Sequence, residues 1–196
     1  MSGNLSELVS SRICHDLISP IGAIGNGLEL IDMTALADMP EIELIRDSIT
    51  NAQARIRFCR IAYGAATEEQ MVGRRELAEI LDDLYKGTRL TVIWHPAADV
   101  PRKRARLALL ALQCAETALG HGGTVDIRED GGSWLVSASG PRLNATSPAW
   151  TFLDGEDRTG TGRATEVQFL LLRHLVDEEG LRLGRRLSEM TLQMSF

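Results

Sequence analysis

Apolar residues in the segment 42–63 recur at alternating intervals of three and four residues, and they are Ile42, Ile45, Ile49, Ala52, Ile56, Cys59 and Tyr63. This spacing is typical of the seam of a coiled coil or helical bundle, because residues three and four apart share one face of an α-helix. Asp38 can cap such a helix, and Pro40 suits its first turn. The apolar seam needs a partner, and this need constrains the fold of the N-terminal part of the chain.

A second amphipathic helix is predicted before this one. At about 100° per residue, one side of it carries apolar residues, namely Ile13, Leu17, Ile24, Leu28 and Ile31. The opposite side is small and polar and is centred on His15, with Ser11, Ser19, Gly22 and Asn26. Two such helices form a hairpin, which buries little surface alone. We therefore expect residues 1–72 to form a four-helix bundle with a second copy across a two-fold axis.

Residues 73–196 have a different character. The pattern predicts helices over 74–86, 101–119 and 164–180, and strands over 89–94, 122–130, 133–139, 181–188 and 189–196, with a long loop over 139–163. Helices that are not interleaved one-for-one with strands favour an α/β sandwich with a mixed or antiparallel sheet. The fold class is therefore α+β, with a helical hairpin (1–72) followed by a sandwich domain (73–196).

Composition narrows the partners and the compartment. The formal net charge of −6 argues against nucleic acid as the main partner. The apolar runs are too short to span a membrane, and the N-terminus lacks the pattern of a signal peptide. Cys14, Cys59 and Cys114 are odd in number and far apart, which fits a reducing compartment. We expect a cytoplasmic protein.

His15 is the candidate reactive residue. An imidazole has an ordinary pKa of about 6.5, so near neutral pH a ring nitrogen is available as a nucleophile. The small residues around His15 would let another protein approach it. Asp16 lies about 100° round the helix and could hold the tautomer that leaves the other nitrogen unprotonated. Pro20 removes a backbone hydrogen bond and would bend the helix nearby. On spacing alone, a solvent-exposed histidine remains the alternative.

Other residues could support the same chemistry. Arg12, one turn before His15, could steady the negative charge of a group carried by His15, or it could be a solvated surface arginine. Ser19 could bond the same group, or it could be only a small helix residue. A partner protein is expected to contact Ser11, Gly22, Asn26 and Arg55. The clustering of Arg55 with Arg57 and Arg60 could instead serve solubility.

The stretch "HDLISPI" (15–21) resembles the phosphoacceptor box of two-component histidine kinases. The element order of 73–196 resembles the ATP-binding (Bergerat) domain of the same kinases. Three nucleotide-contacting motifs of that domain are altered here. Leu110 and Cys114 stand where the family has two asparagines, and neither side chain suits Mg²⁺, which prefers oxygen ligands. "GPRLNAT" (140–146) lacks the aspartate that reads adenine, and "GTG" (160–162) is a remnant of the Gly-rich loop.

A kinase-like histidine helix joined to a degenerate ATP-binding domain is similar to the alphaproteobacterial histidine phosphotransferases of the ChpT type. The resemblance implies a homodimeric phosphotransferase that does not phosphorylate itself from ATP. His15 would accept a phosphoryl group from the receiver domain of a hybrid kinase and pass it to the aspartate of a response regulator. The chain would bind no cofactor, and the receiver would supply Mg²⁺.

Two other functions stay open on the sequence. One is an active ATP-dependent histidine kinase core. The other is a non-catalytic dimeric adaptor or anti-activator of a response regulator, which would not need His15. A metal site built from Cys14, His15 and Asp16 is disfavoured, because adjacent residues on a helix point about 100° apart.

Overall fold

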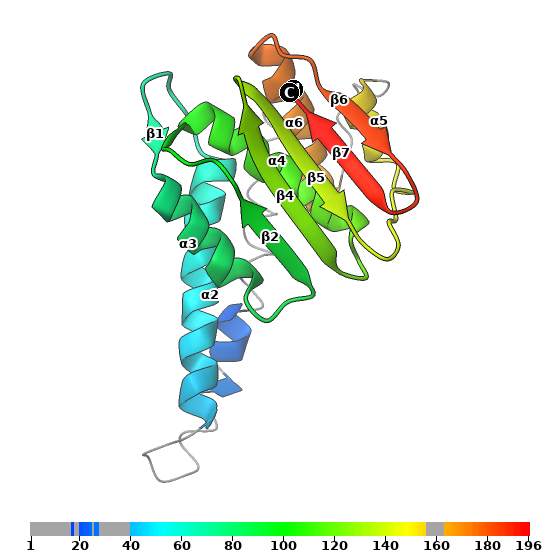
Figure 1. Cartoon of the computed structure of the whole chain (residues 1–196). Coiled ribbons are helices and arrows are strands. Elements are labelled where there is room, and N and C mark those ends of the chain that lie inside the picture. Colours follow the sequence, from blue (N-terminus) through cyan, green and yellow to red (C-terminus); the bar gives the residue numbers. More distant parts are fainter. Residues whose placement is uncertain (1–16, 18–19, 25, 28–39, 156–162) are drawn as a thin grey trace.

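The computed structural model describes residues 17, 20–24, 26–27, 40–155 and 163–196. The long helix α2 (Pro40–Ala62) begins at the proline predicted for its first turn. The helical residues 20–24 and 26–27 lie beside the N-terminal half of α2 (Figure 1). Gly27 is buried there, and a Cβ at that position would overlap the side chain of Ile45. Glycine therefore lets the two helices approach closely at this point.

The rest of the chain forms short strands and helices. In chain order they are β1 (Met71–Val72), α3 (Arg74–Tyr85), β2 (Leu90–Trp94), β3 (Val100–Pro101), α4 (Arg102–Ala118), β4 (Gly123–Asp130), β5 (Ser133–Ser139), α5 (Trp150–Asp154), the 3₁₀ turn η1 (Ala164–Glu166), α6 (Val167–Glu178), β6 (Gly184–Leu187) and β7 (Thr191–Ser195). The long helices and the main strands agree with the sequence prediction to within a few residues.

Five strands make one mixed sheet in the order β2-β4-β5-β7-β6. β2 pairs with β4 in parallel, and the other neighbours pair antiparallel. α4 and α6 cover one face of this sheet, and α3 lies at its β2 edge, between the sheet and α2 (Figure 1). β1 and β3 form a separate antiparallel pair. The predicted α+β class and sandwich are confirmed.

One hydrophobic core runs from the sheet into the end of α2. α4 is its centre, with every residue from Leu107 to Ala115 buried. Ala54, Phe58 and Ile61 of α2 belong to the same cluster of buried residues. Spaced four and three residues apart, these three share one face of the helix. The last two turns of α2 are thus packed on the sandwich domain.

The predicted loop over 139–163 contains a helix that sequence periodicity did not reveal. α5 is only five residues long, and it buries Trp150, Phe152 and Leu153. The Trp150 ring meets Phe169 of α6 edge-on, with centroids 4.8 Å apart. A five-residue helix has too few turns to produce a recognisable apolar period.

Candidate functional site

His15, Asp16, Arg12, Ser11 and Ser19 lie outside the residues that the structure describes. The structure does describe residues 20–24 and 26–27, which follow these positions in the chain. Gly22 and Asn26 are exposed, and a Cβ added at Gly22 would meet nothing within 4 Å. This side of the helix is therefore open to an approaching protein.

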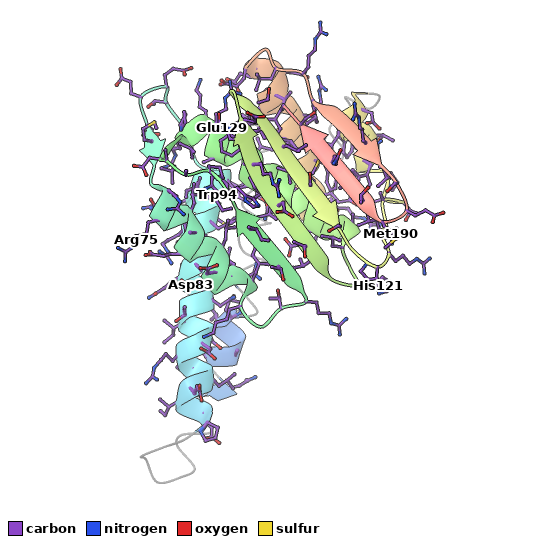
Figure 2. All side chains as sticks on the ribbon, viewed as in Figure 1. Arg75, Asp83, Trp94, His121, Glu129 and Met190 are labelled. Carbon is purple, nitrogen blue, oxygen red and sulfur yellow. The ribbon has the colours of Figure 1, made fainter. Side chains whose placement is uncertain are left out.

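A groove of about 700 Å³ begins at Pro20, which follows His15 by five residues in the sequence. The first helix contributes Pro20 and Ala23, and α2 contributes a run that includes Arg46, Asn51 and Arg55. The C-terminal end of α3 closes the groove with Asp83, Lys86 and Gly87. Figure 2 labels Asp83 on α3, where that helix runs beside α2. The groove is thus built from the hairpin and from the sandwich domain together.

Three of the arginines of α2, Arg55, Arg57 and Arg60, have separate roles. Arg57 forms an ion pair of 3.0 Å with Asp83, and Arg60 forms one of 3.0 Å with Glu76, so both connect α2 to α3. Arg55 instead donates from Nε to Asn51 Oδ1 at 3.1 Å and lines the groove. Among these three, Arg55 is the one that lines the groove.

The apolar seam of α2 is divided along the helix: Cys59 is buried and Tyr63 reaches Gln113 of α4, whereas Ile49 and Ile56 are exposed. At about 100° per residue, Ile45, Ile49 and Ile56 lie roughly opposite the face of Ala54 and Phe58 that is packed on that domain. The side chains of Ile49 and Ile56 are 40% and 54% exposed. Ile21 on the first helix and Leu44 on α2 are 60% and 46% exposed. Ile49 and Ile56 share one side of α2, and exposed large apolar side chains that share a surface are typical of a protein interface.

The positions expected to hold a nucleotide in a kinase are part of the core. Leu110 and Cys114 are completely buried in α4. α5 occupies part of the segment after β5 and is fixed to β6, because Arg185 makes two hydrogen bonds with Asp154, of 2.6 and 3.1 Å. The Arg185 guanidinium also lies 5.6 Å from the centre of the Trp150 ring. Gly160 and Gly162 lie outside the described residues.

The sequence did not predict that residues at the end of α3, Asp83 and Lys86, would form one wall of the groove. Asp83 and Lys86 carry no local motif, and they reach the site only because α3 packs along α2.

A separate polar pair joins β2 and β4 on the open face of the sheet, where His95 Nε2 lies 2.7 Å from Asp126 Oδ1. The hydrogen bond from His95 is the main reason why the pKa of Asp126 is lowered, and burial opposes it.

The described residues contain neither a candidate metal site nor a candidate membrane span. There, His, Cys, Asp and Glu side chains form no group of three that could hold a metal ion. No helix among the described residues has the length and apolar character needed to cross a membrane.

Comparisons with known proteins agree with one another. Residues 74–190 match the family described as "Histidine phosphotransferase C-terminal domain". The protein phosphotransferase ChpT of Brucella abortus (strain 2308) is 35% identical over 187 residues, covering 92% of this chain and 89% of that protein. A solved bacterial phosphotransferase structure superposes with a TM-score of 0.83 at 29% identity, covering all of this chain and 96% of the other.

Proposed function

Because the chain belongs to the histidine phosphotransferase family, we propose a specific route for the phosphoryl group through it. The chain is a histidine phosphotransferase of a phosphorelay, and its partners are kinases and response regulators of two-component systems. Our proposal is that a receiver aspartate of a hybrid kinase gives its phosphoryl group to His15. His15 then passes the group to the aspartate of a response regulator.

The chemistry needs little from this chain beyond a placed nucleophile. An unprotonated nitrogen of His15 attacks the phosphorus in line, the N–P bond forms, and the aspartyl carboxylate leaves as the P–O bond breaks. Asp16 holds the proton on the other ring nitrogen, and Arg12 and Ser19 contact the phosphoryl oxygens. The receiver supplies Mg²⁺. Transfer to the response regulator is the same displacement with the roles of nitrogen and carboxylate exchanged.

The proposed docking surface contains Ser11, Gly22, Asn26 and Arg55 and continues into the groove. The exposure of Gly22 and Asn26 supports this placement, because a receiver needs a low surface near the acceptor. Asp83 and Lys86 would bring the sandwich domain into contact with the same receiver. This contact would give the domain a role in partner choice without nucleotide.

We also propose a homodimer formed by the two hairpins as a four-helix bundle. The exposed seam of Ile49 and Ile56 supports it, since a second copy would cover these side chains. Each dimer would then carry two acceptor histidines. The odd and widely spaced cysteines support a reducing compartment, so we place the protein in the cytoplasm.

The observation that carries the proposal is the 35% identity to a protein phosphotransferase over 92% of the chain, together with the "HDLISP" sequence at His15. Its test is reconstitution of the relay. The chain is mixed with a receiver domain carrying radiolabelled phosphate, and separately with labelled Mg-ATP alone. We expect label from the receiver and none from ATP. Label acquired from ATP alone would overturn the proposed route and would support the kinase alternative.

A further inference from the structure

Two arginines of α4 donate hydrogen bonds to the carbonyl groups that end α2. Arg102 reaches the carbonyl oxygen of Arg60 at 2.5 Å, and Arg106 reaches that of Ala62 at 3.3 Å. The last carbonyl groups of a helix receive no hydrogen bond from an N–H group of the same helix. They therefore need a donor from a capping group, water or another part of the chain. Here the sandwich domain supplies that group. We call Arg102 and Arg106, with these two carbonyl groups, the latch.

The charge of α4 points to a contact outside the helix. Its sequence opens with "RKR" (102–104), and its first turn has no acidic residue. Cations at a helix N-terminus are repelled by the positive end of the helix dipole. The negative, carbonyl end of α2 compensates Arg102 and Arg106. Lys103 is compensated by Glu68 and by Glu179, the latter at 2.7 Å.

Gly64 leaves space for the Arg102 side chain beside the end of α2, and buried residues of α2 hold that helix in place. A Cβ at Gly64 would overlap the carbonyl oxygen of Arg60 and stand 3.2 Å from the Arg102 guanidinium. Arg106 is partly buried, and this burial lowers the pKa of its guanidinium, with Glu178 opposing the change. Phe58 and Ile61, packed in the core, prevent α2 from rotating about its own axis.

We propose that Arg102 and Arg106 are positioning residues for phosphoryl transfer, because the latch holds the sandwich domain at one orientation to α2, the helix that pairs with the helix of His15. The two walls of the groove belong to different parts of the chain, with Arg55 on α2 and Lys86 at the end of α3. When both arginines hold these hydrogen bonds, the two walls of the groove already have the spacing that a bound receiver requires. Binding then loses no free energy to fixing the two walls relative to each other. This inference rests on the proposed function and adds how the chain recognises its receivers.

The test uses the full chain and point variants. Deletion of 74–196 would uncover Ala54, Phe58 and Ile61, so it would damage the hairpin as well as remove the domain. The test variant is Arg102→Gln with Arg106→Gln. The control is Arg104→Gln, which removes one positive charge from the same end of α4 and is compared with the single Arg102→Gln variant as well as with the double variant. Arg104 makes no hydrogen bond or ion pair that involves the described side chains, apart from its helix backbone.

Single-turnover transfer is measured from an acetyl-phosphate-labelled receiver domain, chosen because it saturates the wild-type chain. We expect the half-saturating receiver concentration of the double variant to rise about tenfold, within the range of couplings between separate parts of one protein. The limiting rate at saturation should stay within about twofold, because His15 is unchanged. Arg104→Gln should behave as wild type, and Arg102→Lys with Arg106→Lys should recover part of the loss.

An unchanged half-saturating concentration in the double variant would overturn the inference. So would a fall in the limiting rate alone, since that would place the arginines in the chemistry or in folding. Thermal unfolding checks the fold, and the single Arg102→Gln variant carries the test if the double variant does not fold. His15→Ala in the same assay separates the two proposals. If His15→Ala still acquires label, His15 is not the phosphoacceptor and the proposed function fails. If the double variant has the half-saturating receiver concentration of wild type, only the proposed role of the latch fails.

Discussion

The hydroxyl of Tyr63 donates a hydrogen bond of 2.7 Å to Oε1 of Gln113, joining the end of α2 to the middle of α4. Gln113 is buried, and this bond satisfies one of its amide atoms. Gln168 of α6 is also completely buried, but its Oε1 and Nε2 find no hydrogen-bond partner around it in the described structure. The two glutamines therefore contribute to stability with opposite sign.

Gln168→Leu should raise the free energy of unfolding by about 1–2 kcal/mol, because an unsatisfied buried polar group costs about 1–3 kcal/mol. Gln113→Leu should lower it by a similar amount, because the Tyr63 hydroxyl loses its acceptor. Urea denaturation of both variants measures the difference. A loss of stability in Gln168→Leu as large as that in Gln113→Leu would contradict the packing described here.

The turn between α4 and β4 contains two glycines with different requirements. Gly122 has a φ of 91°, and a Cβ there would stand 2.6 Å from the carbonyl oxygen of Arg89. Gly120 has open space, with nothing within 4 Å of an added Cβ. Gly122→Ala should therefore cost at least about 1–3 kcal/mol of backbone strain. Gly120→Ala should be neutral or slightly stabilising, and thermal unfolding of the pair checks both.

Acid should remove the contribution of Asp126. Its folded-state pKa lies below the ordinary value of 3.8, first because His95 donates a hydrogen bond to it and then because Arg128 lies near. A lowered pKa contributes stability that is complete above the ordinary value and is lost as pH falls through the folded-state value. Wild type should therefore be more stable than Asp126→Asn at pH 5, and the gap should close below pH 3.8. A gap that persists in strong acid would exclude this cause.

Ile49→Glu combined with Ile56→Glu should convert the proposed dimer into a monomer, because two charges would be buried in each half of the apolar seam. Sedimentation velocity measures the change in mass. Ile93→Glu is the matched control, since Ile93 is 39% exposed but lies on β2, away from the hairpin. Dissociation by the control, or a dimer that survives the double change, would place the interface elsewhere.

Local patterns predicted the elements well where they were long or had clear boundaries. Pro40 marked the start of α2, and the glycines at 131 and 132 divided β4 from β5 as the expected hairpin. The seam of α2 was predicted as one apolar face. The structure adds a second apolar face, centred on Phe58 and packed on the sandwich domain. Two opposed faces on one helix are hard to separate when the partner of each is distant in sequence.

The rest depended on contacts between distant residues. The groove joins Pro20 to Lys86, and the latch joins Arg60 to Arg102, so neither leaves a motif in the chain. The basic start of α4 was a readable signal, because it contradicts the helix dipole. The histidine box was identified by resemblance, and its own geometry lies outside the described residues.

Transfer of label from a phosphorylated receiver to the chain shows whether His15 is the phosphoacceptor. The chain has four histidines, so wild type is compared with His15→Ala, His95→Ala, His121→Ala and His174→Ala after mixing with a phosphorylated receiver. We expect acid-labile phosphate on wild type and on the last three variants, and none on His15→Ala. Label retained by His15→Ala, or lost only in one of the other three, would contradict this assignment.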